Sequence, residues 1–190
     1  MRVLIIDEFP ARARALRAAL AKADCEVVGV LASAIALLDQ VEALAPDAII
    51  VDTDSPTRDT LEHIVIVSRD RPRPIVMFGS DAAPDTIREV VRAGVSAYVV
   101  DGLDAKRLRS IIDVAVARFD EFQRLREELA TANRKLSDRR IIDRAKGILM
   151  EARGLSEDAA YDFLRKTAMN RKQRIVDVAR RVLDAAHLLG

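Results

Sequence analysis

Residues 48–54 read Ala-Ile-Ile-Val-Asp-Thr-Asp, an uninterrupted apolar run followed by two acidic residues. Four more short apolar runs begin at residues 3, 26, 74 and 97, and stretches with the apolar spacing of a helix separate them. Strands without polar alternation are typical of a parallel sheet that helices cover on both faces. These five strand–helix repeats predict a doubly wound, five-stranded α/β domain over residues 1–118.

Acidic side chains follow the first and third of these runs: Asp7 and Glu8 after the first, and Asp52 and Asp54 at the third. In a doubly wound sheet such positions meet at the carboxyl edge, near the switch in strand order. Carboxylates gathered there repel one another unless a hard cation or a basic side chain lies between them. Glu8 and Asp52 are candidate Mg²⁺ ligands, although we expect no required cofactor. The alternative is that Asp7 and Asp52 only cap the loops that follow them.

Composition and charge narrow the class of protein. The formal net charge of the 190 residues is +1, but residues 134–190 contain 14 basic and 8 acidic residues, against 17 and 22 in residues 1–133. A basic C-terminal part favours a nucleic-acid partner. Cys25 is the only cysteine, the chain opens without a long apolar leader, and no window approaches the roughly 20 apolar residues of a membrane helix. We therefore predict a cytoplasmic protein without membrane association.

A long helix is expected between the two parts, because residues 105–136 contain neither glycine nor proline. Apolar residues recur there at spacings of four and three, interrupted at Arg118, which is the heptad pattern of a coiled coil. These seam residues are Ile111, Ala115, Phe122, Leu125, Leu129, Ala132 and Leu136. The pattern predicts a connector helix over 105–136, overlapping the last helix of the first domain, that pairs with a second copy of the chain. The alternative is an exposed helix that packs back on the first domain.

Residues 137–190 carry three amphipathic helical patterns. Gly154 stands where the first would end, in the left-handed conformation that glycine tolerates, and Ser156 stands where the second would begin. Ser137 could either cap the first helix or continue it. The segment predicts a small all-α bundle of three helices with a basic surface.

Residues 1–118 resemble the receiver domain of two-component response regulators, which has a flavodoxin-like fold. Asp7 and Glu8 match the paired acids after the first strand, Asp52 matches the phosphoacceptor, and Tyr98 matches the switch aromatic. The resemblance implies that these residues form a regulatory pocket.

Two further receiver positions depart from that pattern. The hydroxyl expected at the end of the fourth strand falls on Gly79, with Ser80 one residue later, and the expected lysine falls on Asp101. A phosphoryl group on Asp52 would therefore gain a negative neighbour in place of a cation. We expect this domain to serve as a docking surface that ordinary phosphorylation by a histidine kinase does not drive.

The C-terminal segment resembles the ANTAR domain, an RNA-binding antitermination module. The resemblance rests on residues 142–150, Ile-Asp-Arg-Ala-Lys-Gly-Ile-Leu-Met, and on residues 154–160 and 164–169 in register with them. With the receiver-like part, the whole chain is similar to the nitrate-assimilation antiterminators of the NasT type. The resemblance implies a non-enzymatic homodimer that holds paired stem-loops in leader mRNA, and an inhibitory sensor protein that responds to nitrate or nitrite.

Basic side chains of this segment are the candidate contacts to RNA phosphates and base edges. Small residues beside them would let RNA or a neighbouring helix approach closely. The candidates are Arg139, Arg140, Arg144, Lys146, Arg165, Lys166, Arg171 and Lys172, with Ala145 and Gly147 as the small residues.

Two other functions compete with this interpretation. A DNA-binding response regulator should carry a recognition helix in a helix-turn-helix, whereas the last helical pattern includes Asp177 and Asp184 and is rich in alanine and valine. Asp52 and Asp54 also resemble the nucleophile and acid/base of haloacid-dehalogenase-type phosphatases. That Mg²⁺-dependent chemistry needs a lysine near the transferred phosphoryl group, and the sequence offers none at a suitable position.

Overall fold

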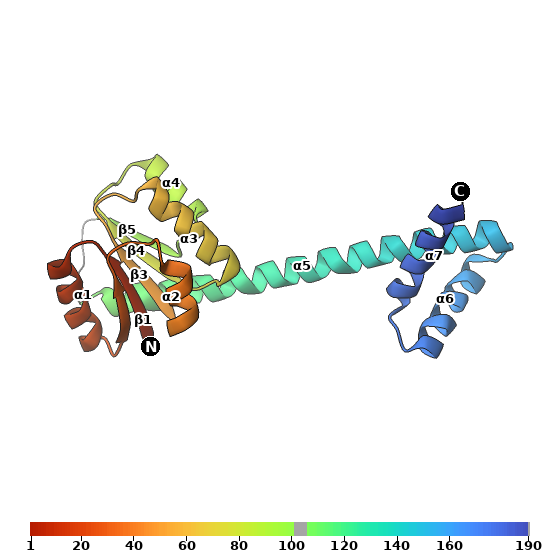
Figure 1. The fold of residues 1–190 in the computed structure, drawn as a ribbon, viewed down its shortest axis with the longest axis horizontal. Coiled ribbons are helices and arrows are strands. Elements are labelled where there is room, and N and C mark those ends of the chain that lie inside the picture. Colours follow the sequence, from red (N-terminus) through yellow and green to blue (C-terminus); the bar gives the residue numbers. More distant parts are fainter. Residues whose placement is uncertain (101–105, 190) are drawn as a thin grey trace. The chain divides into compact units, whose positions relative to one another are not determined.

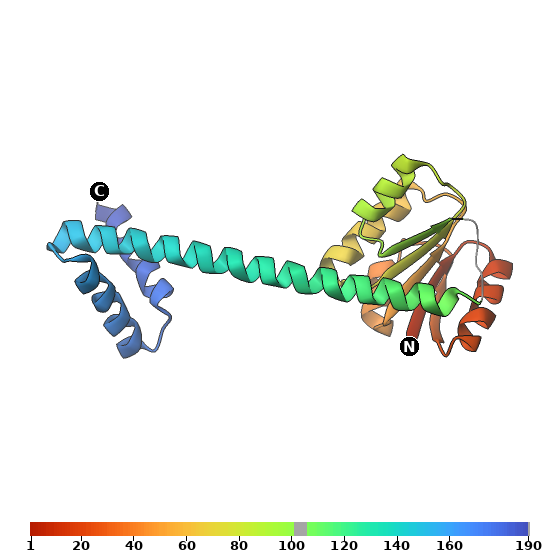
Figure 2. The same cartoon turned by 180° about the vertical axis from the view of Figure 1, so that it is seen from behind.

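The computed structural model describes residues 1–100 and 106–189, the last three by their backbone alone. Strands and helices alternate in the first part of the chain, and only helices follow (Figures 1 and 2). The elements are β1 (Arg2–Asp7), α1 (Pro10–Lys22), β2 (Glu26–Leu31), α2 (Leu37–Leu44), β3 (Ala48–Asp52), α3 (Arg58–Asp70), β4 (Ile75–Gly79), α4 (Pro84–Arg92), β5 (Ala97–Val100), α5 (Leu108–Arg153), α6 (Glu157–Arg171) and α7 (Ile175–Leu189).

The five strands form one parallel sheet in the order β2-β1-β3-β4-β5. The chain moves outward from β1 in one direction to β2 and in the other to β3, so the strand order switches beside β1. Asp7 at the end of β1 lies in register with Asp52 at the end of β3. The predicted five-stranded doubly wound fold is confirmed, and its switch point brings two of the predicted acids together.

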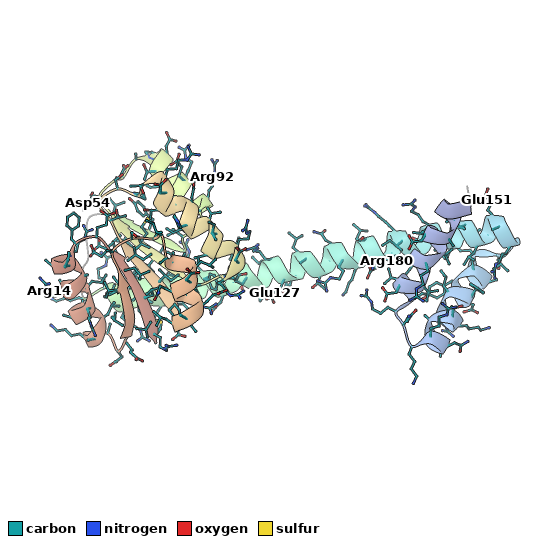
Figure 3. All side chains as sticks on the ribbon, viewed as in Figure 1. Arg14, Asp54, Arg92, Glu127, Glu151 and Arg180 are labelled. Atoms are coloured by element: carbon teal, nitrogen blue, oxygen red, sulfur yellow. The ribbon has the colours of Figure 1, made fainter. Side chains whose placement is uncertain are left out.

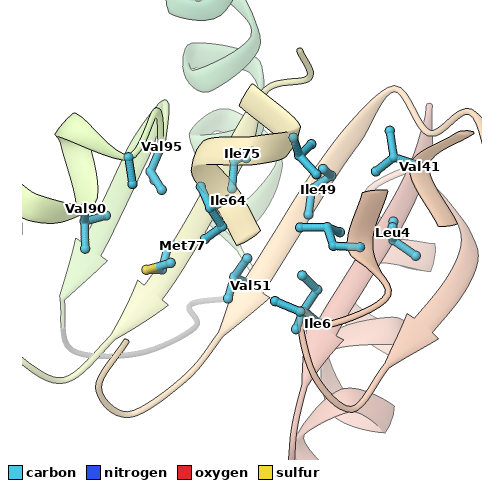
Figure 4. Close-up of a cluster of buried hydrophobic side chains, with 14 residues drawn as sticks. Leu4, Ile6, Val41, Ile49, Val51, Ile64, Ile75, Met77, Val90 and Val95 are labelled. Atoms are coloured by element: carbon cyan, nitrogen blue, oxygen red, sulfur yellow. The ribbon is translucent and has the colours of Figure 1, made fainter. Parts of the chain in front are cut away.

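Two apolar clusters cover the two faces of this sheet. On one face α2, α3 and α4 contribute side chains such as Val41, Ile64 and Val90 (Figure 4). On the other face the contributors are α1 and the start of α5, with Leu108 and Ile112 fully buried. Burying a side chain of this size contributes about 1.5–3 kcal/mol. The continuous apolar runs of the sequence are therefore the central layer of a three-layer domain.

The first part of the predicted dimer seam belongs to this core. Ala115 is fully buried and Ile111 packs against the same cluster, so their assignment to a coiled coil is wrong. A helix that lies on a sheet has the same three-and-four spacing as one that pairs with another helix, and the pattern alone does not separate the two. Exposure of the seam begins at Phe122, which is 59% exposed, and continues at Leu125, Leu129 and Leu136.

The predicted connector and the predicted first bundle helix are one helix, the 46-residue α5. Ser137 continues it, because nothing between residues 106 and 146 breaks a helix. Gly154, at φ +62°, follows its last residue as expected. The next helix starts as predicted after Ser156, whose hydroxyl accepts a hydrogen bond from the Ala159 amide at 3.2 Å.

The contacts divide the chain into two compact units, residues 1–123 and 124–190. The core of the second unit joins the end of α5 to α6 and α7 through buried residues that include Ala145, Leu149, Leu164 and Ala179. The predicted bundle therefore consists of two short helices and the end of a long one. None of the helices in the described part of the chain is long and apolar enough to span a membrane.

Candidate functional site

A guanidinium group lies among the acids at the switch point. Arg12 Nε is 3.1 Å from Asp7 Oδ1 and 3.3 Å from Asp52 Oδ2, and Nη1 is 2.8 Å from Asp54 Oδ1. Nη2 donates to the Asp52 carbonyl oxygen at 3.0 Å. All three guanidinium nitrogens are engaged, and one side chain bridges the three carboxylates.

The local sequence accounts for the position of Arg12. Pro10 opens α1, which places Arg12 in the first helical turn, next to the end of β1. Asp7 Oδ1 also accepts a hydrogen bond from the Phe9 amide at 2.8 Å, which holds the loop between strand and helix. The Phe9 ring lies 4.8 Å from the Arg12 guanidinium carbon, within the range of a cation–π contact. The guanidinium is therefore held by the carboxylates and by an aromatic ring.

The electrostatics of this pocket reflect burial and charge together. Burial raises the pKa of the Asp52 carboxyl; Arg12 opposes that rise, while the charges of Asp7 and Asp54 add to it. Burial opposes ionisation of Arg12, but the neighbouring Asp52 and Asp7 outweigh it and the pKa of the guanidinium is raised. Arg12 is thus a permanent cation in a pocket where the carboxylates carry more charge than it neutralises.

Mg²⁺ does not fit this arrangement. Receiver domains commonly bind Mg²⁺ at such a pocket, but here the Asp7 and Asp52 oxygens are engaged by Arg12. Glu8 is exposed, and the described residues contain no group of three potential ligands arranged to hold a metal. The described residues therefore give no support to the expected use of Glu8 with Asp52 as metal ligands.

At the end of β4, Gly79 stands where a receiver domain is expected to have a hydroxyl side chain, and Tyr98 uses the space that this leaves. A Cβ atom added at Gly79 would lie 2.4 Å from Tyr98 Oη, so the tyrosine occupies the space that a side chain would need. Tyr98 donates to the Asp81 carbonyl oxygen at 2.9 Å. Ser80 Oγ donates to the Asp54 carbonyl oxygen at 2.7 Å. Asp101, where the lysine was expected, lies outside the described residues.

The acidic residues of the sequence predict a cation or a basic side chain among them, but they do not identify Arg12 as that side chain. An arginine five residues after a strand-ending aspartate, in the first turn of the next helix, is the available signal. It is weak, because Arg14 and Arg17 follow on the same helix and only the geometry distinguishes them.

In the second unit most of the candidate RNA-binding side chains are exposed on α5 and α6. They are Arg139, Arg140, Arg144, Arg165, Lys166, Arg171 and, at the α6 C-cap, Lys172. Gly147 is also exposed, and a Cβ atom there would meet nothing within 4 Å. Ala145 is fully buried in the core of the second unit. Its small side chain packs against the neighbouring helices and is not accessible to RNA.

Lys146 differs from the other basic candidates. Its side chain is only 14% exposed, and Nζ lies 2.8 Å from Asp143 Oδ1 and 2.7 Å from Glu157 Oε1. Hydrogen bonds to Asp143 and Glu157 raise its pKa. Because Glu157 begins α6, this ion pair links the end of α5 to the next helix, and the positive charge of Lys146 is already neutralised within the fold.

A hollow of about 430 Å³ lies beside this ion pair. Its lining combines cations, carboxylates and an aromatic ring: Lys135, Asp138, Arg139, Ile142, Asp143, Lys146 and Tyr161. An exposed ring next to hydrogen-bonding groups can stack on an unpaired base and contact its edge.

Comparison with protein families matches residues 3–113 to the response regulator receiver domain and residues 130–183 to the ANTAR domain. The transcriptional regulatory protein PdtaR of Mycobacterium tuberculosis is 30% identical over 183 residues, 96% of this chain and 89% of that protein. The nitrate regulatory protein of Klebsiella oxytoca is 32% identical over 88 residues, 46% of this chain and 22% of that protein.

The solved structures agree with the fold of the first unit. The receiver domain of a modulated diguanylate cyclase from Desulfovibrio desulfuricans G20 has a TM-score of 0.56 at 22% identity, over 63% of this chain and 95% of that one. The receiver domain of NarL from Mycobacterium tuberculosis has a TM-score of 0.54 at 20% identity, over 60% and 94%.

Proposed function

Because this chain belongs to the response regulators that join a receiver domain to an ANTAR domain, we propose that it is a cytoplasmic antitermination regulator that binds paired stem-loops in leader mRNA. The observation that carries the proposal is the set of exposed basic side chains on α5 and α6 within the ANTAR match. RNA binding would favour one of two hairpins in the transcript, and no bond is made or broken. The relative that matches 96% of this chain, PdtaR, is a transcriptional regulatory protein, in keeping with a protein that is not an enzyme.

The RNA contacts we propose are charge contacts along α6 and at the end of α5. Arg165 and Lys166 are consecutive residues of α6, and both are exposed. Guanidinium and ammonium groups so placed can pair with phosphates, and the hollow beside Tyr161 can accept an unstacked loop base. This combination suits a folded RNA loop better than a uniform duplex.

The test begins with a library of two-stem-loop RNAs whose loops are randomised, from which the full-length protein selects its ligands. The selected RNA is then compared with its duplex DNA counterpart and with a scrambled RNA in gel shifts across a salt series. We expect binding to the paired stem-loops alone, and a salt slope that falls by about one for each phosphate contact removed. Equal binding to all three probes would contradict the proposal, and preference for duplex DNA would favour the DNA-binding alternative.

Paired variants make this test specific to the proposed surface. Lys166→Gln should weaken RNA binding and reduce the salt slope. Arg181→Gln, an exposed charge of α7 that is not among the candidates, is the matched control and should leave both unchanged.

We further propose that a second copy of the chain covers the exposed seam of Phe122, Leu125, Leu129 and Leu136. Apolar side chains at this spacing on an exposed helix face are typical of a coiled coil. A homodimer would present two ANTAR surfaces to the two stem-loops of one RNA, which increases affinity without new contacts.

Regulation, in this proposal, comes from an inhibitory sensor protein that docks on the receiver domain. The similarity to a nitrate regulatory protein favours nitrate or nitrite as the inducer. In the sequence, Asp101 stands where a receiver domain is expected to have a lysine, and the loss of that cation disfavours a phosphoryl group on Asp52. Treatment with acetyl phosphate and Mg²⁺ should therefore leave the intact mass unchanged. Stoichiometric phosphorylation that disappears in Asp52→Ala would refute this part.

A further inference from the structure

We propose that Arg12 is the resident cation of the acidic pocket, and that its side chain keeps divalent metal ions out of this receiver domain. The proposal concerns the pocket itself and does not depend on RNA binding. It rests on the contacts of one guanidinium, on the burial of the acids around it and on the ring beside it.

Arg12 and a metal ion would compete for the same oxygen atoms. Both Asp7 oxygens lie within 3.2 Å of Arg12 Nε, and the Asp52 carboxylate and carbonyl oxygens are engaged as well. Mg²⁺ would need such oxygens at about 2.0–2.1 Å in a near-octahedral shell. The groups that could form this shell are turned toward Arg12, and a dication beside the guanidinium would be repelled by it.

Buried carboxylates and an aromatic ring hold Arg12 in the pocket. The side chain of Asp7 is fully buried and that of Asp52 is only 12% exposed. If Arg12 left without a replacement, at least one of these carboxylates would remain buried and unpaired, which is strongly destabilising. The Phe9 ring on the guanidinium adds a contact that a hydrated metal ion would not inherit. Departure of Arg12 therefore has a cost that a weakly bound metal must overcome.

The population of conformers in which Arg12 has left the pocket sets the loss of metal affinity. A metal ion can bind only the conformers in which Arg12 has left, and minor conformers of this kind are typically populated at roughly 0.1–10%. The apparent affinity falls in proportion to that population. Metal binding by the wild type should thus be about 10- to 1,000-fold weaker than binding by a variant that lacks the guanidinium.

Arg12→Met tests this directly in the full-length protein. It removes the charge and hydrogen bonds but keeps an unbranched chain in the first turn of α1. Arg14→Met is the matched control, since Arg14 is exposed on the same helix and has no ion pair among the described residues (Figure 3). Mn²⁺ binding is measured by water-proton relaxation, and the melting temperature is compared with and without 10 mM Mg²⁺, about the level that detects millimolar affinity.

Arg12→Met should bind Mn²⁺ saturably and melt at a higher temperature in Mg²⁺, and Asp52→Asn in the same background should abolish both effects. Wild type and Arg14→Met should show neither. Arg12→Gln, which retains hydrogen-bonding capacity without charge, serves if Arg12→Met does not fold. Wild-type binding as tight as that of the Arg12 variants would overturn the proposal, and so would folded Arg12 variants that bind no metal.

Discussion

Gly147→Ala should make the C-terminal unit more stable and its RNA binding weaker. Gly147 lies in the interior of α5, it is exposed, and an added Cβ atom meets nothing within 4 Å. A helix-interior glycine is roughly 0.5–1 kcal/mol less favourable than alanine. With a shift of about 4–8 °C per kcal/mol for a unit of this size, the melting temperature should rise by about 2–8 °C.

The same methyl group should lower the affinity for RNA. Close approach of a partner to the backbone at this open helical position would be blocked by an added methyl group. The selected two-stem-loop RNA should bind Gly147→Ala about tenfold more weakly, a loss of about 1.4 kcal/mol. The assays are thermal unfolding followed by circular dichroism and a gel-shift titration of the same preparation.

Thr131→Ala provides the comparison, because Thr131 is an exposed α5 residue that is not among the candidate RNA contacts, and alanine improves helix propensity there too. It should raise stability slightly and leave RNA affinity unchanged. An unchanged or lower melting temperature for Gly147→Ala would refute the structural reasoning. A stabilised Gly147→Ala that binds RNA normally would remove Gly147 from the proposed interface.

Three further predictions concern the receiver pocket and the exposed seam. Gly79→Ser should lower the free energy of unfolding in urea by about 1–3 kcal/mol, because its Cβ atom would overlap Tyr98 Oη. If the loss were as large in a Tyr98→Ala background, this overlap would not be its cause. Leu129→Glu should shift the dimer toward monomer in sedimentation equilibrium while Thr131→Glu does not; equal effects of the two would refute the seam. Since the pKa of Asp52 is raised, chiefly by burial, ionised Asp52 lowers stability at neutral pH, and this cost is relieved as the pH falls through that pKa. Asp52→Asn should flatten that part of the pH profile of unfolding free energy, and an unaltered profile would contradict it.

The parts of the fold that follow from local pattern were predictable from the sequence. Continuous apolar runs predicted the buried strands, and Gly154 and Ser156 predicted the turn between α5 and α6. The heptad spacing was ambiguous by nature, because Ala115 and Leu129 obey one periodicity although a sheet covers the first and the described residues leave the second exposed. Periodicity identifies an apolar face; it does not identify what lies on that face.

The candidate site was harder to predict because its decisive contacts join distant residues. Arg12 meets Asp52 and Asp54 only after β1 and β3 pair. Lys146 looked like one more surface cation in the sequence, but the start of α6 brings Glu157 to it. In both cases residue type and spacing indicated the chemistry, and the fold determined whether the charge remained available for a ligand.

The exposed middle of α5 should open locally more often than the rest of the structure. Residues 124–137 are helical, yet all their side chains are exposed, so neither core stabilises them. Isolated helices of this length are marginal in water, and their backbone amides should exchange with deuterium by local fraying, long before either core opens. Association along the seam would slow that exchange, so the amides of this stretch report assembly directly.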